Sequence, residues 1–194
     1  LRLGRTRVEP RVIGKACVNG SSEMVANIAM SLVGMLYNLQ LMVYVGADGV
    51  AAYGVIMYTG LVFGAVFIGY SMGSSPLMSF QYGAKNTVEM RNLLRKSLAF
   101  VGAGGIAMFA AAQLLAAPIS AAFVGYDAAL EQLTVQGFRL YSISFLFMGF
   151  SIYGSAFFTS LNNGLVSALI SFLRTLVFEV ASVLLLPLLL GVTG

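Results

Sequence analysis

The sequence contains no histidine, and its single cysteine is Cys17. One thiol cannot form a disulfide within the chain, and a Cys/His metal site is excluded. Charged residues are also scarce, at 9% of the chain, whereas a soluble domain carries about 25%. Because so few charges could not cover a water-facing surface, we expect lipid to be the main solvent of this protein.

Hydrophobic residues make up 59% of the chain and gather in long uncharged runs. Only helices and closed barrels satisfy every backbone group in hydrocarbon. Barrel strands would alternate apolar and polar residues, whereas runs such as 183–190 are apolar on all sides. We therefore predict an all-α polytopic transmembrane helix bundle, because about 20 apolar residues span a bilayer. The five predicted spans are 24–45, 50–72, 98–115, 135–158 and 165–190.

Three details of these spans are also predicted. The second span contains several glycines and Pro76, so we expect a bent or broken continuation as far as Phe80. The polar segment 81–96 is expected to lie at the membrane interface. Pro118 is expected to close the third span.

The charges predict an orientation independently of hydropathy. Nine of the eleven basic residues fall on one side of a five-span arrangement: Arg2, Arg5, Arg7, Arg11, Lys15, Lys85, Arg91, Arg95 and Lys96. The opposite loops carry Asp48, Asp127 and Glu131 and no Lys or Arg. The positive-inside rule makes the basic side, with the N-terminus, cytoplasmic. Since the charges sit between apolar spans, nucleic acid is not an expected partner.

Three ionisable residues lie inside the predicted spans, where charge is costly and indicates function. Glu179 is well inside the fifth span and is a candidate for binding a proton, a cation or a cationic drug. It could instead be a structural partner of Arg174 or Arg139, although a spacing of five from Arg174 does not suit an α-helical pair. Arg174 and Arg139 are more simply explained by packing or by snorkelling to an interface.

Polar and aromatic side chains add further candidates for a cavity. Tyr37, Asn38 and Gln40 form a polar cluster within the first span, where such side chains face protein or a water-filled cavity. Aromatic and methionine residues suit both promiscuous binding of cations and ordinary packing. The residues of this kind are Tyr53, Met57, Tyr58, Phe150, Tyr153 and Phe157.

Three stretches resemble multidrug and toxic compound extrusion (MATE) transporters. They are LYNLQLMVYVGADGVAAYGVIMY (36–58), GYSMGSSPLMSFQYGAKN (69–86) and the long stretch 138–180 that begins FRLYSISF. The resemblance covers the chain from Gly20 onward and favours the DinF/MepA-like branch. It implies that residues 1–19 are a cytoplasmic linker between two six-helix lobes, and that 20–194 are helices seven to eleven of twelve. The chain would then be a fragment that lacks its N-terminal lobe.

The resemblance implies a function as well. Members export amphipathic, often cationic, small molecules in exchange for Na⁺ or H⁺, and need no cofactor beyond that coupling ion. The expected partners are the bilayer, the missing lobe and small-molecule substrates, in what we expect to be a bacterial inner membrane. Leu41 replaces the family's N-lobe coupling aspartate, and Met30 and Met148 lie near the positions of an acidic pair found in NorM-like members. The likeness thus places the coupling acid outside this chain.

Three alternatives remain open. A lipid-linked oligosaccharide flippase of the same superfamily would need several basic residues for a pyrophosphate, and only Arg139 and Arg174 are available. An intramembrane enzyme would need a base, nucleophile or metal that the spans lack, so we do not expect an enzyme. The chain could also be a non-functional truncation product.

Overall fold

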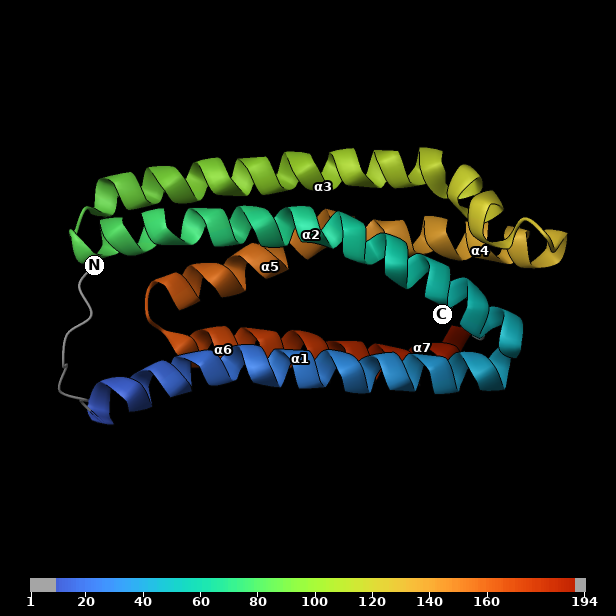
Figure 1. The fold of residues 1–194 in the computed structure, drawn as a ribbon, viewed down its shortest axis with the longest axis horizontal. Helices are drawn as coiled ribbons and strands as arrows, with labels where there is room; N and C mark the ends of the chain where they lie inside the picture. The colour runs from blue at the N-terminus through green and yellow to red at the C-terminus, as the bar shows by residue number, and fades with distance from the viewer. Residues whose placement is uncertain (1–9, 191–194) are drawn as a thin grey trace, which may run out of the picture.

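The computed structural model describes residues 10–190, apart from the side chains of Leu176, of 186–190 and of several positions between 12 and 26. Every element within that range is helical (Figure 1). The elements are α1 (Pro10–Tyr44), α2 (Ala47–Gly83), α3 (Thr87–Val124), α4 (Ala128–Tyr141), the short 3₁₀ helix η1 (Ser142–Ser144), α5 (Phe145–Ser160), α6 (Gly164–Phe172), the π-helical η2 (Leu173–Glu179) and α7 (Val180–Leu190). The predicted all-α bundle is confirmed.

Among the residues that the structure describes, four helical segments are long and apolar enough to cross a membrane: Ala47–Gly83, Thr87–Val124, Ala128–Ser160 and Gly164–Leu185. They coincide with the second to fifth predicted spans. The first predicted span falls within α1, which is not among the four. Three amide side chains, those of Asn27, Asn38 and Gln40, lower the apolar character of that helix.

The turns between helices correct several predicted boundaries. The segment 81–96 holds the end of α2 at Gly83 and the start of α3 at Thr87, where the Asn86 side chain accepts a hydrogen bond from the backbone N–H of Glu89. Its position at the membrane interface stays a prediction. Pro118 does not close the third span, since α3 continues through it to Val124. A proline is tolerated inside a membrane helix when neighbouring groups satisfy the freed carbonyl.

Two further predictions concern the ends and bends of helices. Residues 1–9 of the predicted linker 1–19 lie outside the described residues. The rest of the linker belongs to α1, which begins at Pro10. Proline suits the first turn of a helix because its missing N–H would have no partner there. The bend predicted for the continuation beyond residue 72 does not occur there, because α2 stays one continuous helix across Pro76 to Gly83 and changes direction instead near its middle (Figure 1).

The helices form two layers (Figure 1). In one layer α1 lies alongside α6, η2 and α7, and in the other α2, α3, α4 and α5 pack together. The buried apolar clusters lie in the second layer, where Phe67, Val101 and Tyr153 are packed at one level and Ile56, Phe138 and Phe145 at another. The α1–α2 and α5–α6 turns connect the layers at opposite ends, so residues that face across them come from distant parts of the sequence.

Candidate functional site

Glu179 is the last residue of η2 and lies about four helical turns in from the start of α6, so its depth corresponds to the middle of the span. Its side chain is half-buried. Three tyrosines from other helices lie within electrostatic range of its carboxylate: Tyr37 of α1, Tyr53 of α2 and Tyr141 of α4. Because these tyrosines come from α1 of one layer and from α2 and α4 of the other, the carboxylate lies near the place where the two layers meet.

Tyr37 and Tyr53 bring α1 and α2 together next to this carboxylate. Their rings are stacked, with centroids 5.2 Å apart and planes inclined by 19°. The two residues lie roughly two helical turns on either side of Gly46, so the tight turn sets them at the same depth. Gly46 has a φ of 84°, which glycine adopts without steric cost.

Tyr141 approaches the site from the end of α4. Its ring meets Phe145 edge-on, with centroids 5.6 Å apart and planes at 90°. Its hydroxyl passes close to Gly60, where an added Cβ would lie 3.2 Å from that oxygen. Because Gly60 has no side chain, the Tyr141 ring can extend over α2 where α2 and α4 pack together.

Arg174 lies on the same element as Glu179 but is not hydrogen-bonded to it. Its Nη1 donates to Ser151 Oγ of α5 at 3.0 Å, and its Nε donates to Thr175 Oγ1 at 3.5 Å. The five-residue spacing argues against an α-helical pair, yet η2 is a π-helix with i→i+5 hydrogen bonds. Because that geometry brings residues five apart towards one side, the objection based on spacing does not hold here.

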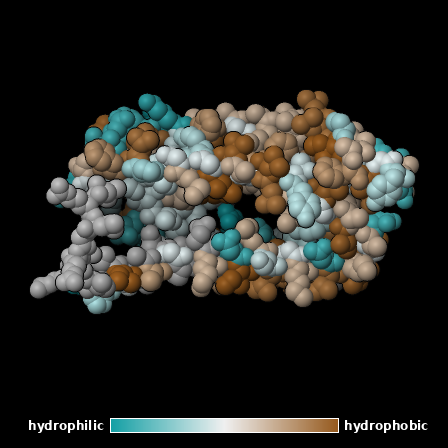
Figure 2. Space-filling model, viewed as in Figure 1, coloured by the Kyte–Doolittle hydropathy of each residue, from teal (hydrophilic) through white to brown (hydrophobic). Residues whose placement is uncertain are grey.

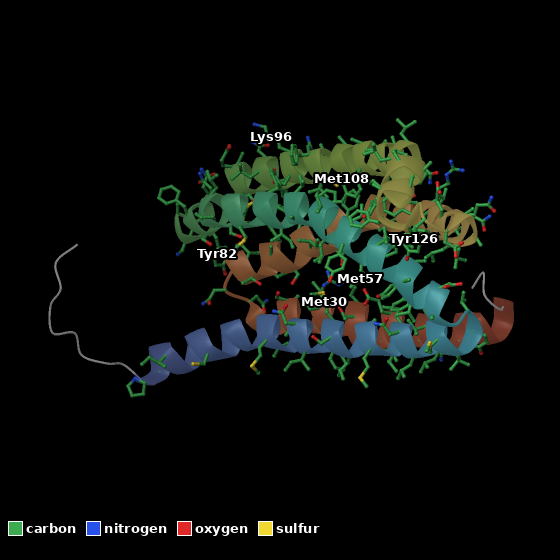
Figure 3. All side chains as sticks on the ribbon, turned by 45° about the vertical axis from the view of Figure 1, so that its right-hand side comes forward. Met30, Met57, Tyr82, Lys96, Met108 and Tyr126 are labelled. Carbon is green, nitrogen blue, oxygen red and sulfur yellow. The ribbon has the colours of Figure 1, made fainter. Side chains whose placement is uncertain are left out.

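The other residues predicted for the cavity lie at different places. Met57 lies on α2, on the side towards α1, across from Met30, which was not predicted for the cavity (Figure 3). Gln40 is half-buried on α1. Asn38 is exposed, and its side-chain amide donates to the backbone carbonyl of Gly34 at 2.8 Å. This hydrogen bond lies within α1.

Tyr153 and Arg139 are apart from the Glu179 group. Tyr153 is 2% exposed and packs with Phe67, Met78 and Val101 in the core of the second layer. It lies beside Tyr70, which lines a separate cavity of about 250 Å³ between α2 and α3. The side chain of Arg139, in the last turn of α4, is exposed, and its backbone carbonyl accepts hydrogen bonds from Gln113 and Ser142.

Two residues of the site carry no recognisable signal in the sequence. Tyr141 and Ser151 are ordinary tyrosine and serine residues in apolar runs, and only the packing of α4 and α5 brings them to η2. Tyr53 is one of many aromatic residues in the spans, and nothing in the sequence pairs it with Tyr37. The sequence therefore singled out Glu179, Arg174, Tyr37 and Tyr53 one by one, but not their grouping, and it missed Tyr141 and Ser151.

The chemistry of this arrangement suits a cation. In the space-filling view an opening separates the two layers near the middle of the molecule, and hydrophilic residues lie at its edge (Figure 2). A carboxylate within electrostatic range of three tyrosines attracts a positive charge, and tyrosine rings in general also bind cations through their faces. Within the described part of the chain, no three His, Cys, Asp or Glu side chains come together as a metal site would require.

Comparisons with known proteins agree with this architecture. The family model named MatE matches residues 24–184, which is most of the chain. No curated protein and no solved structure matches. The match includes all four apolar helical segments nearly in full and the whole Glu179 group. The chain is thus an integral membrane protein that belongs to the MatE family of multidrug and toxic compound extrusion transporters.

Proposed function

We propose that this chain forms part of a secondary active transporter that exports amphipathic or cationic small molecules in exchange for Na⁺ or H⁺. The observation that carries the proposal is the group of Glu179, Tyr37, Tyr53 and Tyr141 between the two helix layers. Transporters bind their substrates near the middle of the membrane, where helix repeats meet. A carboxylate at that depth costs about 2.5–3.5 kcal/mol unless protein or a ligand compensates it.

The arrangement in the membrane follows from the charges. We propose that the α2–α3 and α5–α6 turns face the cytoplasm of a bacterial inner membrane, with α1 as a fifth span. Lys85, Arg91, Arg95 and Lys96 all lie at or just beyond the α2–α3 turn, which supports that side as cytoplasmic. The DinF/MepA-like branch, a missing N-terminal lobe and the numbering of the spans as helices seven to eleven belong to the same proposal.

The flippase alternative has less support than cation export. A pyrophosphate would require several cations that converge on one cavity. Arg174 lies beside an acidic residue, and the side chain of Arg139 is exposed elsewhere. The site that these residues form is better suited to a cation than to a polyanion.

Dye accumulation in cells tests the proposal. Cells that express the full-length protein should retain less ethidium than cells with the empty vector, and a collapsed Na⁺ or H⁺ gradient should abolish the difference. Reconstituted vesicles with one gradient at a time would then identify the coupling ion. Unchanged accumulation across a broad panel of cationic dyes would contradict cation export.

A further inference from the structure

We propose that Arg174 is a tethered cation that competes with the transported cation for Glu179, and that Ser151 holds it away so that the site can be occupied. This inference rests on the proposed function and adds a control element to the same site. It assigns Ser151 and Arg174 as positioning residues, since both act on the transported cation through Glu179.

The contacts of the two charges show that each lacks an ionic partner. As far as the structure describes the chain, Arg174 bonds to neutral hydroxyls alone, those of Ser151 at 3.0 Å and Thr175 at 3.5 Å. Glu179 has no hydrogen bond or ion pair with another described residue, although the charge of Arg174 acts on it at longer range. A carboxylate left alone in a membrane span needs a compensating cation or proton. Glu179 therefore lacks such a partner among the described residues, and a proton or a transported cation can supply it.

The backbone of η2 keeps the alternative pairing within reach. In an α-helix, residues five apart point about 140° away from each other, since each residue turns the chain by about 100°. The i→i+5 bonds of the π-helix bring such residues back towards one side. Arg174 can therefore change from Ser151 to Glu179 by a rotation of its long side chain, while the helix stays in place.

Apart from Thr175, whose Oγ1 is already 3.5 Å from Nε of Arg174, the neighbouring hydroxyls offer Arg174 no substitute for Ser151. One turn further along α5, Ser155 Oγ shares hydrogen bonds with Ser167 Oγ at 2.9 Å and with Ser171 Oγ at 3.0 Å. Ser167 also accepts from Thr159 at 2.8 Å. These hydroxyls already satisfy one another between α5 and α6. If Ser151 loses its hydroxyl, the best remaining partner for the guanidinium is the carboxylate of Glu179, because charge-assisted pairs are the strongest hydrogen bonds.

The matched pair Ser151→Ala and Ser155→Ala tests this in the full-length protein. With Ser151→Ala, Arg174 occupies Glu179, and we expect the KM for ethidium to rise about fivefold or more, a typical coupling between sites, with kcat little changed. Ser155→Ala removes a hydroxyl from the same face of α5 without touching Arg174, so its KM should stay within about twofold of wild type. Ser151→Thr keeps the hydroxyl and should restore the wild-type KM.

A double variant separates this role from simple packing. Adding Arg174→Gln to Ser151→Ala removes the competing cation, so the KM should return towards that of the Arg174→Gln single variant. The effects of the two substitutions on the KM for ethidium would then be strongly non-additive. If Ser151 only holds helices together, the two serine variants will behave alike and Arg174→Gln will add to the defect of Ser151→Ala. That result would overturn the inference.

A chemical readout decides the inference even if ethidium is not transported. A hydrophobic carbodiimide reacts with a protonated carboxyl that has no ion-pair partner, and peptide mass spectrometry can locate the adduct on Glu179. We expect labelling of Glu179 in purified Ser151→Ala protein to be about fivefold slower than in wild type, with Ser155→Ala unchanged. Equal labelling of Glu179 in the wild type, Ser151→Ala and Ser155→Ala proteins would contradict the proposal that Arg174 competes for Glu179. A wild-type protein that labels as expected but moves no dye would contradict the proposed function alone.

Discussion

Tyr37 of α1 stacks on Tyr53 of α2 with ring centroids 5.2 Å apart, and both tyrosines lie within electrostatic range of the Glu179 carboxylate. Through this pair the first layer of helices meets the second close to the candidate cation site. The stack gives a stability contribution as well as a binding surface, and the two can be separated by substitution.

Replacing the ring of Tyr37 should affect both stability and transport. Tyr37→Ala removes the stack and should lower the free energy of unfolding by about 0.5–1.5 kcal/mol beyond the loss of buried area. It should also weaken ethidium export, whereas Tyr37→Phe keeps the ring and should retain most of both. Tyr126→Ala is the control, since Tyr126 is 81% exposed in the α3–α4 turn. Thermal unfolding in detergent and dye efflux measure the two effects, and a Tyr37→Ala protein indistinguishable from Tyr126→Ala would refute the role of the stack.

Gly149 of α5 marks the closest packing in the second layer. An added Cβ would lie 2.6 Å from Val101 Cγ1 and 2.7 Å from Phe67 Cε1, so Gly149→Ala should cost about 1–3 kcal/mol through overpacking. Gly154→Ala in the same helix meets nothing within 4 Å and should leave stability the same or slightly higher. Melting temperatures of the two purified variants provide the comparison. Equal melting temperatures would show that the α2–α3–α5 contact is looser than described.

The hydroxyl contacts between α5 and α6 should contribute modestly to stability. Ser155→Ala removes bonds to Ser167 and Ser171 and should cost about 0.6 kcal/mol, the average for polar contacts between membrane helices, and at most about 1.7. Ser31→Ala is a suitable control, because Ser31 is exposed and its hydroxyl bonds to a carbonyl of its own helix. Unfolding in a denaturing detergent measures the difference. A larger loss for Ser31→Ala would contradict the assigned role of the α5–α6 hydroxyls.

The predicted orientation can be read by labelling single cysteines in intact cells. With Cys17 replaced by serine, a cysteine in place of Tyr126 should react with an impermeant maleimide added outside. A cysteine in place of Asn162 should react only after the cells are opened, because that turn lies on the basic side. The reverse pattern would invert the proposed topology.

The helical spans follow from the sequence because lipid imposes a simple rule of length and hydrophobicity. That rule located α2 to α7 but misjudged their ends, since Asn86 caps α3 at the turn and Pro118 is carried inside it. Glu179 and Arg174 stood out because charge is rare in a membrane. Their surroundings could not be read from the sequence, because the π-helix of η2 and the approach of Ser151 and Tyr141 depend on the packing of distant helices.

Substitution of Glu179 tests the central claim most directly. Glu179→Gln keeps the size of the side chain and removes its charge, so coupled ethidium export by the full-length protein should fall at least tenfold while membrane expression stays at the wild-type level. Glu179→Asp keeps the charge and should retain measurable export, and Glu131→Gln, in the first turn of α4, should export at the wild-type rate. Wild-type export by Glu179→Gln would contradict the assignment of this carboxylate to the transport site.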